Sequence, residues 1–527
     1  MKKVIFILAA VLFTGVVEAQ KKQPAIKPFT SAEVKDAKSE ADALYKALNY
    51  TTALKIFERL VITEPNNADY NYKLGMCYLN TNINKGKAVP YLEFASNANT
   101  KTKPKDVVFD LAKSYHYAGL YDKAIETFEA YRVSKGGTVD AKLKFDQWVS
   151  WSYNAKKLTE NVISCSWTNL GKGINSDKGD YRPVMSVADS IVYFCSKRKG
   201  TTGGLTDELG ESPSDIYFFT QNDSGMSKAK NAGINVNTEF YEETLFLNMS
   251  GDRMLIYREG PESSGDIYIS DQAGKSWNKP VLISKDFQTK VLETGATLTP
   301  DGLTLYFSAE AVDGKTGKDI YRCTRTESTS WGKPEKLSNV INTNGDEDNP
   351  VIWLDGKTMF FSSTGHNSMG GLDIFATTKN SPNEEWSLPV NLGYPINSVY
   401  DDFNIALTGD AKTAYMAAVR DSGMGDYDLY KVTFEKPLLP SPVTWLQGKC
   451  ITNVGGPAKG AFVVVTDAAS GASIASTETN AANGRFDLAL PIGTYKIVAK
   501  HPKAGKAETT ITVEQGVAKV VVDLVFP

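Results

Sequence analysis

The segment from Gly345 to Thr378 concentrates the residue types that could carry chemistry. It reads GDEDNPVIWLDGKTMFFSSTGHNSMGGLDIFATT and combines acids, a Trp, an Asp-Gly turn, paired glycines and His366. A loop histidine among carboxylates is a candidate general base or metal ligand. The other histidines, His116 and His501, are remote in the sequence, and no Ser-His-Asp arrangement, HExxH or Walker loop is present. The residue types therefore predict no catalytic residue, no metal site and no cofactor.

Most of this segment has counterparts elsewhere in the chain, which indicates a structural repeat. The tripeptide Asp-Ile-Tyr or a close variant recurs at intervals of 51, 53, 54 and 55 residues, at Asp215, Asp266, Asp319, Asp373 and Asp428. A turn and an aromatic strand precede each copy, and a further strand such as 386–393 follows it. Four strands per unit predict the blade of a β-propeller, and the repeats predict five blades over residues 162–437.

The strand led by Trp that ends these units is missing after the last copy, where the chain reads FEKPLLPSP. A matching strand, WTNLG at 167–171, lies ahead of the first unit instead. We expect this N-terminal strand to complete the last blade and thereby to close the ring.

An acidic position recurs six residues after the Ile or Val of an I-N-[ST] pattern. The carboxylates are Asp180, Glu242, Glu347 and Asp402, with Glu293 at the comparable place in the third unit. Each precedes an innermost strand, which in a propeller borders the central channel. Five carboxylates around one mouth would focus a negative potential and attract a basic peptide, a partner loop or a cation. The alternative is that each caps a turn or bonds to its neighbouring blade. The asparagine of the pattern is expected to hold loop backbone.

Residues 37–160 have the periodicity of paired helices. LGxxY ending at Tyr78 and LAxxY ending at Tyr115 are equivalent segments 37 residues apart, close to the length of a tetratricopeptide repeat. The small residue lets two helices approach, and the aromatic ring fills the space beside it. Tyr78 and Tyr115 are therefore expected in the core, and the helical groove near them is a candidate surface for a peptide or a protein.

The two ends of the chain differ from its middle. Residues 1–19 combine Lys2 and Lys3 with an apolar run that ends in Val17-Glu18-Ala19, which predicts a signal peptide and export to the periplasm. Residues 20–36 are polar and predict a linker. Residues 443–527 alternate Val, Thr, Ala and Gly around tight turns, which predicts a small antiparallel β-sandwich of about seven strands. The predicted fold is thus multidomain: an all-α array, an all-β propeller and a sandwich.

Charge and cysteine usage restrict the function classes. The chain has 58 basic and 61 acidic residues, giving a net charge of −3, which disfavours a nucleic-acid partner. No later apolar run is long enough to predict a transmembrane segment in the mature chain. The five cysteines have no metal-ligand spacing, and only Cys165 with Cys195 is a candidate disulfide.

Several of these patterns resemble known families. The pattern I-N-[ST]-x-x-x-[DE], then Asp-Gly, a Tyr-Phe-Ser-Ser-type strand, a Gly-Gly loop and Asp-Ile-Tyr, resembles the TolB-type propeller repeats of envelope proteins. GK at 448–449, GRF at 484–486 and LPxGxY at 490–495 resemble a carboxypeptidase regulatory-like domain. With the tetratricopeptide-like part, this domain order resembles the PorE-like periplasmic components of the type IX secretion system. The resemblance implies a non-catalytic scaffold, peripheral to the outer membrane, with envelope or outer-membrane proteins as partners.

The chain departs from that family at its C-terminus. The family usually ends in an OmpA-like domain that binds peptidoglycan, whereas this sequence stops at Pro527, so peptidoglycan binding is not expected. A second class of function stays open, namely a module that binds glycans or peptidoglycan fragments, or a propeller hydrolase. A sialidase-type Ser-x-Asp-x-Gly-x-x-Trp box is approached only at Ser270 to Trp277, where Gln272 replaces the Asp.

Overall fold

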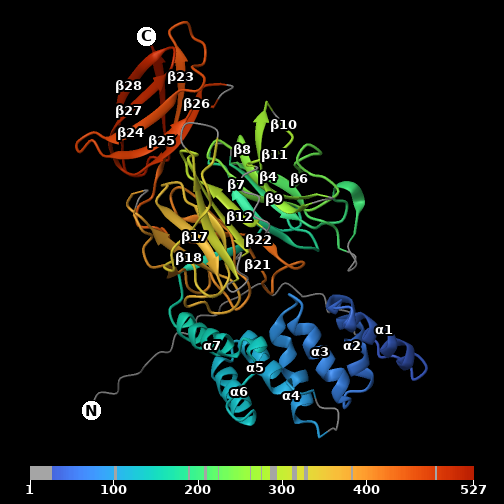
Figure 1. Cartoon of the computed structure of the whole chain (residues 1–527). Helices are drawn as coiled ribbons and strands as arrows, with labels where there is room; N and C mark the ends of the chain where they lie inside the picture. Colours follow the sequence, from blue (N-terminus) through green and yellow to red (C-terminus); the bar gives the residue numbers. More distant parts are fainter. Residues whose placement is uncertain are drawn as a thin grey trace, which may run out of the picture.

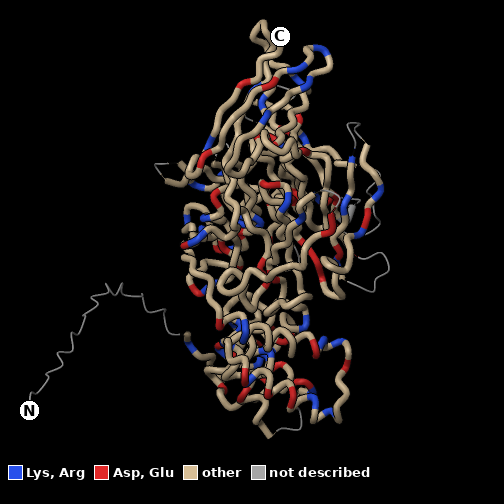
Figure 2. Tube along the Cα trace, turned by 90° about the vertical axis from the view of Figure 1, so that its left-hand side faces the viewer, with Lys and Arg blue, Asp and Glu red and all other residues tan. Residues whose placement is uncertain are grey.

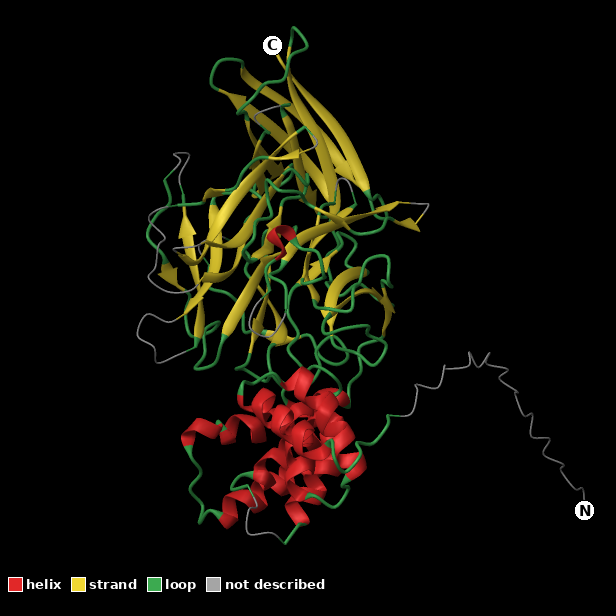
Figure 3. Ribbon diagram, turned by 90° about the vertical axis from the view of Figure 1, so that its right-hand side faces the viewer, coloured by secondary structure: helices red, strands yellow, loops and turns green. Residues whose placement is uncertain are grey.

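Helices occupy the N-terminal part of the molecule and strands the rest (Figures 1 and 3). The computed structural model describes residues 26–99, 104–187, 190–206, 211–222, 225–260, 263–274, 276–284, 293–310, 317–325, 330–381, 384–480 and 483–527. The predicted signal peptide at 1–19 lies outside these ranges. Within them, every helix is too short or too polar to cross a membrane.

The helical part consists of antiparallel neighbours joined by short loops. In the described residues its α-helices are α1 (Val34–Lys46), α2 (Tyr50–Thr63), α3 (Ala68–Leu79), α4 (Val89–Asn97), α5 (Val107–Tyr117), α6 (Tyr121–Ser134) and α7 (Phe145–Thr159), with the short 3-10 helices η1 (Lys85–Ala88) and η2 (Ala141–Leu143). Helix α1 therefore begins inside the stretch predicted as a linker. A Cβ atom at Gly75 would lie 2.6 Å from the Cγ of Leu92, which explains why a small residue is needed where α3 meets α4.

Between residues 165 and 434 the described strands form five antiparallel sheets of four or five strands each. Their members are β2 (Asp180–Met185), β3 (Ile191–Ser196), β4 (Asp215–Asn222), β5 (Gly225–Met226) and β6 (Lys230–Asn231) in the first; β7 (Glu242–Leu247), β8 (Arg253–Gly260), β9 (Ser263–Ala273), β10 (Ser276–Trp277) and β11 (Val281–Leu282) in the second; β12 (Glu293–Leu298), β13 (Thr304–Glu310), β14 (Lys318–Thr324) and β15 (Glu335–Lys336) in the third; β16 (Glu347–Ile352), β17 (Thr358–Ser363), β18 (Asp373–Thr378) and β19 (Val390–Asn391) in the fourth; β20 (Ile405–Leu407), β21 (Thr413–Ala418), β22 (Asp428–Phe434) and β1 (Cys165–Asn169) in the fifth. A single-turn 3-10 helix, η3 (Thr202–Gly204), lies between β3 and β4.

The sheets are arranged as a propeller-like ring, with one hydrophobic core between each pair of neighbours. Phe219 of the first sheet, for example, packs against Tyr415 of the fifth with ring centroids 5.7 Å apart. The ring is closed as the sequence predicts, because β1 pairs with β22 and Trp167 lies opposite Val432. Since β1 precedes all the other strands in the chain, its pairing holds the two ends of the ring together.

The last part of the chain forms two packed sheets. They contain β23 (Thr444–Thr452), β24 (Phe462–Asp467), β25 (Ser473–Glu478), β26 (Arg485–Leu490), β27 (Gly493–His501), β28 (Gly505–Val513) and β29 (Lys519–Phe526), in the orders β26-β23-β29 and β25-β24-β27-β28. The prediction of a purely antiparallel sandwich is wrong at β29, which pairs with β23 in parallel. The reason is that the chain crosses from one sheet to the other after β28 instead of turning back in a hairpin.

The three parts are arranged in line, with the ring in the middle (Figure 1). At the helical end, Trp151 Nε1 donates to the Thr364 carbonyl at 3.1 Å, and Asn154 Nδ2 donates to the Ser368 carbonyl at 2.9 Å. At the other end, Ser250 Oγ donates to the carboxylate of Asp487 in the sandwich at 2.5 Å. Basic and acidic residues are interspersed in all three parts of the molecule (Figure 2).

Candidate functional site

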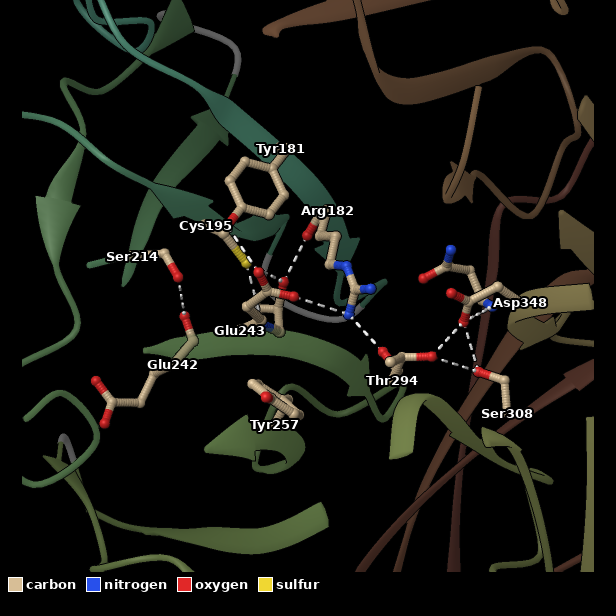
Figure 4. Close-up of polar contacts among 12 residues, drawn as sticks. Tyr181, Arg182, Cys195, Ser214, Glu242, Glu243, Tyr257, Thr294, Ser308 and Asp348 are labelled. Atoms are coloured by element: carbon tan, nitrogen blue, oxygen red, sulfur yellow. Dashed lines mark hydrogen bonds and ion pairs between the residues drawn. The ribbon is translucent and has the colours of Figure 1, made fainter. Parts of the chain in front are cut away.

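The densest polar cluster of the ring lies at the inner strands, where side chains from four sheets meet (Figure 4). Arg182 of β2 reaches across to Glu243 of β7 at 3.1 Å and donates to the carbonyl of Thr294 in β12 at 2.8 Å. The Thr294 hydroxyl donates in turn to Asp348 of β16 at 2.9 Å. We call Arg182, Glu243, Thr294 and Asp348 the channel network. It joins the first four sheets through one continuous set of polar contacts.

The backbone of the inner strands is distorted where this network forms. Arg182, Asn349 and Asn404 have φ values of 52°, 52° and 55°, in the left-handed region that residues other than glycine seldom adopt. In β2 and β16 the register with the next strand shifts at this position, as expected for a β-bulge. A bulge redirects the neighbouring side chains, which here places Arg182 among the carboxylates of other sheets.

The charges of the channel network stabilise one another. Burial alone would raise the pKa of Asp348, but Lys318 at 2.8 Å, Arg182 and a hydrogen bond from Ser308 more than offset it and hold the pKa below its usual range. For Arg182, burial opposes the charged form, but Glu243 and Asp348 outweigh it and raise the pKa. Both groups are therefore ionised at neutral pH, and Asp348 is a poor donor of protons.

A buried cysteine adjoins the network but is not activated. Cys195 of β3 accepts a hydrogen bond from the Thr244 amide at 3.2 Å. Burial raises its pKa to about 12, so the group is a neutral thiol and a weak nucleophile. The candidate disulfide between Cys165 and Cys195 is not formed, since all five cysteines are free.

The five carboxylates predicted at the channel mouth are buried at the starts of, or just before, the inner strands. Asp180, Glu242, Glu293, Glu347 and Asp402 have at most 3% of their surface exposed. Four of them accept two hydrogen bonds from the Ser or Thr of their own I-N-[ST] loop, one from its backbone amide and one from its hydroxyl. The distances from the amide nitrogen are 2.6 Å for Asp180, 2.8 Å for Glu242, 2.6 Å for Glu347 and 2.6 Å for Asp402. For these four carboxylates the geometry agrees with the alternative hypothesis, in which the carboxylate caps a turn. Ligand binding by these groups stays a prediction.

Two of these carboxyl groups have strongly perturbed acidity. Burial raises the pKa of Glu242 to about 7, against the opposing effect of hydrogen bonds from Thr238 and the charge of Arg258. Burial likewise raises the pKa of Asp402 to about 7, with Ser398 and Arg420 opposing it. A substantial fraction of both groups is thus protonated at neutral pH.

The asparagine of each I-N-[ST] loop bonds to the sheet before it in the ring, as predicted for a residue that holds backbone. The side-chain amide of Asn397 accepts from the amide of Ile374 at 2.8 Å and donates to its carbonyl at 2.9 Å. Asn175, Asn237 and Asn342 make the same pair of bonds to Leu429, Ile216 and Ile320. These four side chains therefore connect neighbouring sheets.

The helical tyrosines and the loop histidine are also placed. Tyr78 and Tyr115 are buried in the helical core, and their hydroxyls donate to Glu58 and Glu93, each at 2.6 Å. Binding of a partner in a helical groove near them stays a prediction. His366 is exposed in a loop next to α7, and its Nε2 lies 2.9 Å from the carbonyl of Ile341. Within the described residues, no group of three or more acidic, His or Cys side chains could hold a metal ion.

Sequence reasoning missed the channel network. Its members differ in type from one unit to the next, so no repeat marks them. The available signal was their position one or two residues after the recurrent acid, at the start of the inner strands of the first four sheets.

Comparisons with known proteins give only distant likenesses. No protein-family model matches the chain, and no curated protein matches it. Among solved structures, it is similar to a putative TolB from Agrobacterium tumefaciens at 11% identity over 63% of this chain and 99% of that chain, with a TM-score of 0.30. It is similar to TolB from Acinetobacter baumannii at 13% identity over 73% of this chain and 74% of that chain, with a TM-score of 0.29. It is also similar to an endo-arabinase from Bacteroides thetaiotaomicron at 15% identity over 49% of this chain and 97% of that chain, with a TM-score of 0.35. Since these TM-scores are low, the propeller-like fold is concluded from the sheets and hydrophobic cores described above.

Proposed function

We propose that this protein is a non-catalytic scaffold of the periplasm that binds envelope proteins and is linked to type IX secretion or gliding machinery. In this proposal residues 37–160 are a tetratricopeptide array, residues 162–437 a five-bladed TolB-like propeller and residues 443–527 a carboxypeptidase regulatory-like domain. Residues 1–19 direct export, and the mature chain is peripheral to the outer membrane.

The observation that carries the proposal is a polar strip that crosses three neighbouring helices of the array. Lys73 of α3 bonds to Asp42 of α1 at 2.7 Å and to Asp69 at 2.8 Å. Lys113 of α5 bonds to Asp110 at 2.8 Å, and Asp110 also accepts from the hydroxyl of Tyr72 on α3 at 3.0 Å. We call the set formed by Asp42, Asp69, Lys73, Asp110 and Lys113 the helical strip.

The helical strip has the chemistry that suits an extended partner segment. The side chains of Lys73 and Lys113 are 20% exposed and that of Asp69 is 48% exposed, so donors and acceptors are both within reach of a partner. Side chains already held by ion pairs lose little freedom on binding, which lowers the entropic cost of recognition.

The propeller hydrolase alternative finds less support in the channel. Glycoside hydrolysis needs a protonated carboxylic acid opposite a second carboxylate. Asp348 has a lowered pKa and is held by Lys318 and Ser308. Glu242 and Asp402 have the raised pKa of an acid, but they are buried within their own loops. An enzyme would need a different pair of groups.

Affinity capture from native envelopes after crosslinking tests the proposal. The chain with Lys73→Ala and Lys113→Ala should retain its fold and capture much less envelope protein, because the substitutions remove both basic side chains of the helical strip. A charge-matched control is Lys35→Ala with Lys157→Ala, which removes two exposed lysines elsewhere in the array. Equal capture by the wild type and both variants would exclude the helical strip as the partner site.

A glycan array probes the other class of function. Binding of a defined glycan by the full chain, unaffected by the two lysine substitutions, would favour the glycan-binding module over the scaffold.

A further inference from the structure

A cavity of about 480 Å³ lies where the inner strands end, between the ring and the sandwich. The inner strand of each sheet contributes at least one apolar side chain to its wall, among them Met185, Phe246, Leu298, Val351 and Leu407. This volume falls in the range of sites for small molecules, roughly 300–1,000 Å³. The cavity is therefore a chamber with apolar side chains on its inner wall, at the end of the channel opposite the helices.

The rim of the chamber is charged, and most of its charges are already paired. Arg253 forms a two-point ion pair with Asp271 at 2.7 and 3.2 Å. Arg485 does the same with Asp487 at 2.8 and 3.1 Å.

The remaining rim carboxylates are also satisfied or lie in water. Asp252 accepts from the side chains of Asn248 and Asn480, and Asp301 accepts two hydrogen bonds within its own turn. Glu478 is exposed to solvent. None of these groups needs a ligand cation.

Arg325 is the exception among these charges. It is only partly exposed, and its Nε donates to the Gly302 carbonyl at 2.8 Å. Within the described part of the chain, no carboxylate lies within ion-pair distance of its guanidinium. Burial, with the nearby charge of Arg253, lowers the pKa of Arg325 despite Glu478 and Asp301. The guanidinium lies over the ring of Trp331, 5.2 Å from its centroid, so an anion placed here would give this cation an ion-pair partner.

We propose that the chamber binds a small amphipathic carboxylate, with its apolar body against the inner strands and its carboxylate on Arg325. The apolar wall supplies most of the affinity through burial. In the part of the chain that the structure describes, the two terminal nitrogens of Arg325 have no hydrogen-bond partner, and the guanidinium matches a carboxylate in shape. This site is separate from the helical strip, so the two proposals can be tested independently of each other.

Titration calorimetry of the full chain with decanoate and with decanol, both below their aggregation limits, tests this site. Decanoate should bind at one site, at least about tenfold more tightly than decanol, since a charge-assisted hydrogen bond contributes that much. Arg325→Gln should weaken decanoate binding about tenfold and leave decanol binding unchanged. Arg322→Gln removes an exposed arginine from the same strand, where it pairs with Glu335, and should change neither.

Val351→Phe, which fills the chamber, should abolish binding of both compounds, with circular dichroism to verify the fold. Absence of decanoate binding to the wild type would overturn the proposal, and so would equal binding of decanol. Undiminished decanoate binding by Arg325→Gln would also overturn the proposal. The same holds if Arg322→Gln weakens decanoate binding as much as Arg325→Gln does. Both outcomes are decisive whether or not Val351→Phe folds.

Discussion

Asp373 exemplifies how the repeated residues act in this molecule. It begins β18, is fully buried, and its Oδ2 accepts from the Met369 amide at 2.9 Å and from Asn391 at 2.6 Å. Burial raises its pKa well above the usual range, against the hydrogen bonds from Asn391 and Met369. A residue that occurs in every unit therefore serves the fold of the unit.

Replacement of Asp373 tests this structural role. Asp373→Ala should reduce the free energy of unfolding by about 1–3 kcal/mol, because two buried donors lose their acceptor. Asp373→Asn keeps an acceptor oxygen for these donors, so it should cost less. Urea unfolding of both variants measures the difference. Unchanged stability of the alanine variant together with lost partner binding would contradict the structural role.

The buried carboxyl groups Glu242 and Asp402 predict a pH dependence. Their pKa is about 7 in the folded protein, against roughly 4 in the unfolded chain. The folded state thus binds more protons between these values, and stability should fall as pH rises from about 4 to about 7, by up to about 1.4 kcal/mol per pH unit for each group.

Urea unfolding at pH 5 and pH 8 measures this slope. The Glu242→Gln and Asp402→Asn double variant should lose less stability between the two pH values than the wild type. His116 titrates with the opposite sign, because burial lowers its pKa to about 3, but it is present in both proteins and cancels. Identical pH profiles would mean that both carboxyl groups are ionised in the folded state.

At the scale of elements, the docking of a loop between two helices fixes the array to the ring. Met369 is fully buried against Ala155 of α7 and Val399. His116 of α5 lies beside the next residue, Gly370, and its Nδ1 is 3.0 Å from Ser152 of α7. Gly370 has a φ of 155°, and a Cβ atom there would lie 2.8 Å from His116 Nε2 and 2.9 Å from the Val399 carbonyl.

Gly370→Ala should therefore loosen the helical part from the ring without unfolding either. Small-angle scattering should show a larger radius of gyration, and proteolysis should become faster at residues 160–164 between α7 and β1. Asn367→Ala, an exposed position of the same loop, serves as the control. A scattering curve identical to that of the wild type would show that the junction tolerates the added methyl group.

The elements were largely predictable from sequence because they repeat. The spacing of Asp-Ile-Tyr located the third strand of each sheet, and the early strand at Trp167 located the closure of the ring.

The contacts between unlike parts were not predictable. Residues of other types stand at the positions equivalent to Arg182 in the other units, and Met369 contacts the helical part only in the tertiary structure. The acidic positions were found, but their burial depends on loops that fold over them.

At the scale of the whole molecule, the three parts form one elongated body with polar contacts at both junctions (Figure 1). The helical strip and the chamber lie on opposite sides of the ring, because the chamber is where the inner strands end and the helices contact the loops where they begin. A scaffold with two separated sites could hold one partner while it binds another ligand. We expect loss of either site to leave the other intact.

The most direct test of the scaffold proposal is site-specific photo-crosslinking in cells that make the protein. A photoreactive residue at position 69, in the helical strip, is compared with one at position 133, which is 77% exposed on α6. The proposal predicts discrete adducts with an envelope protein from position 69 and none from position 133. Absence of adducts from position 69, or the same adducts from both positions, would contradict it.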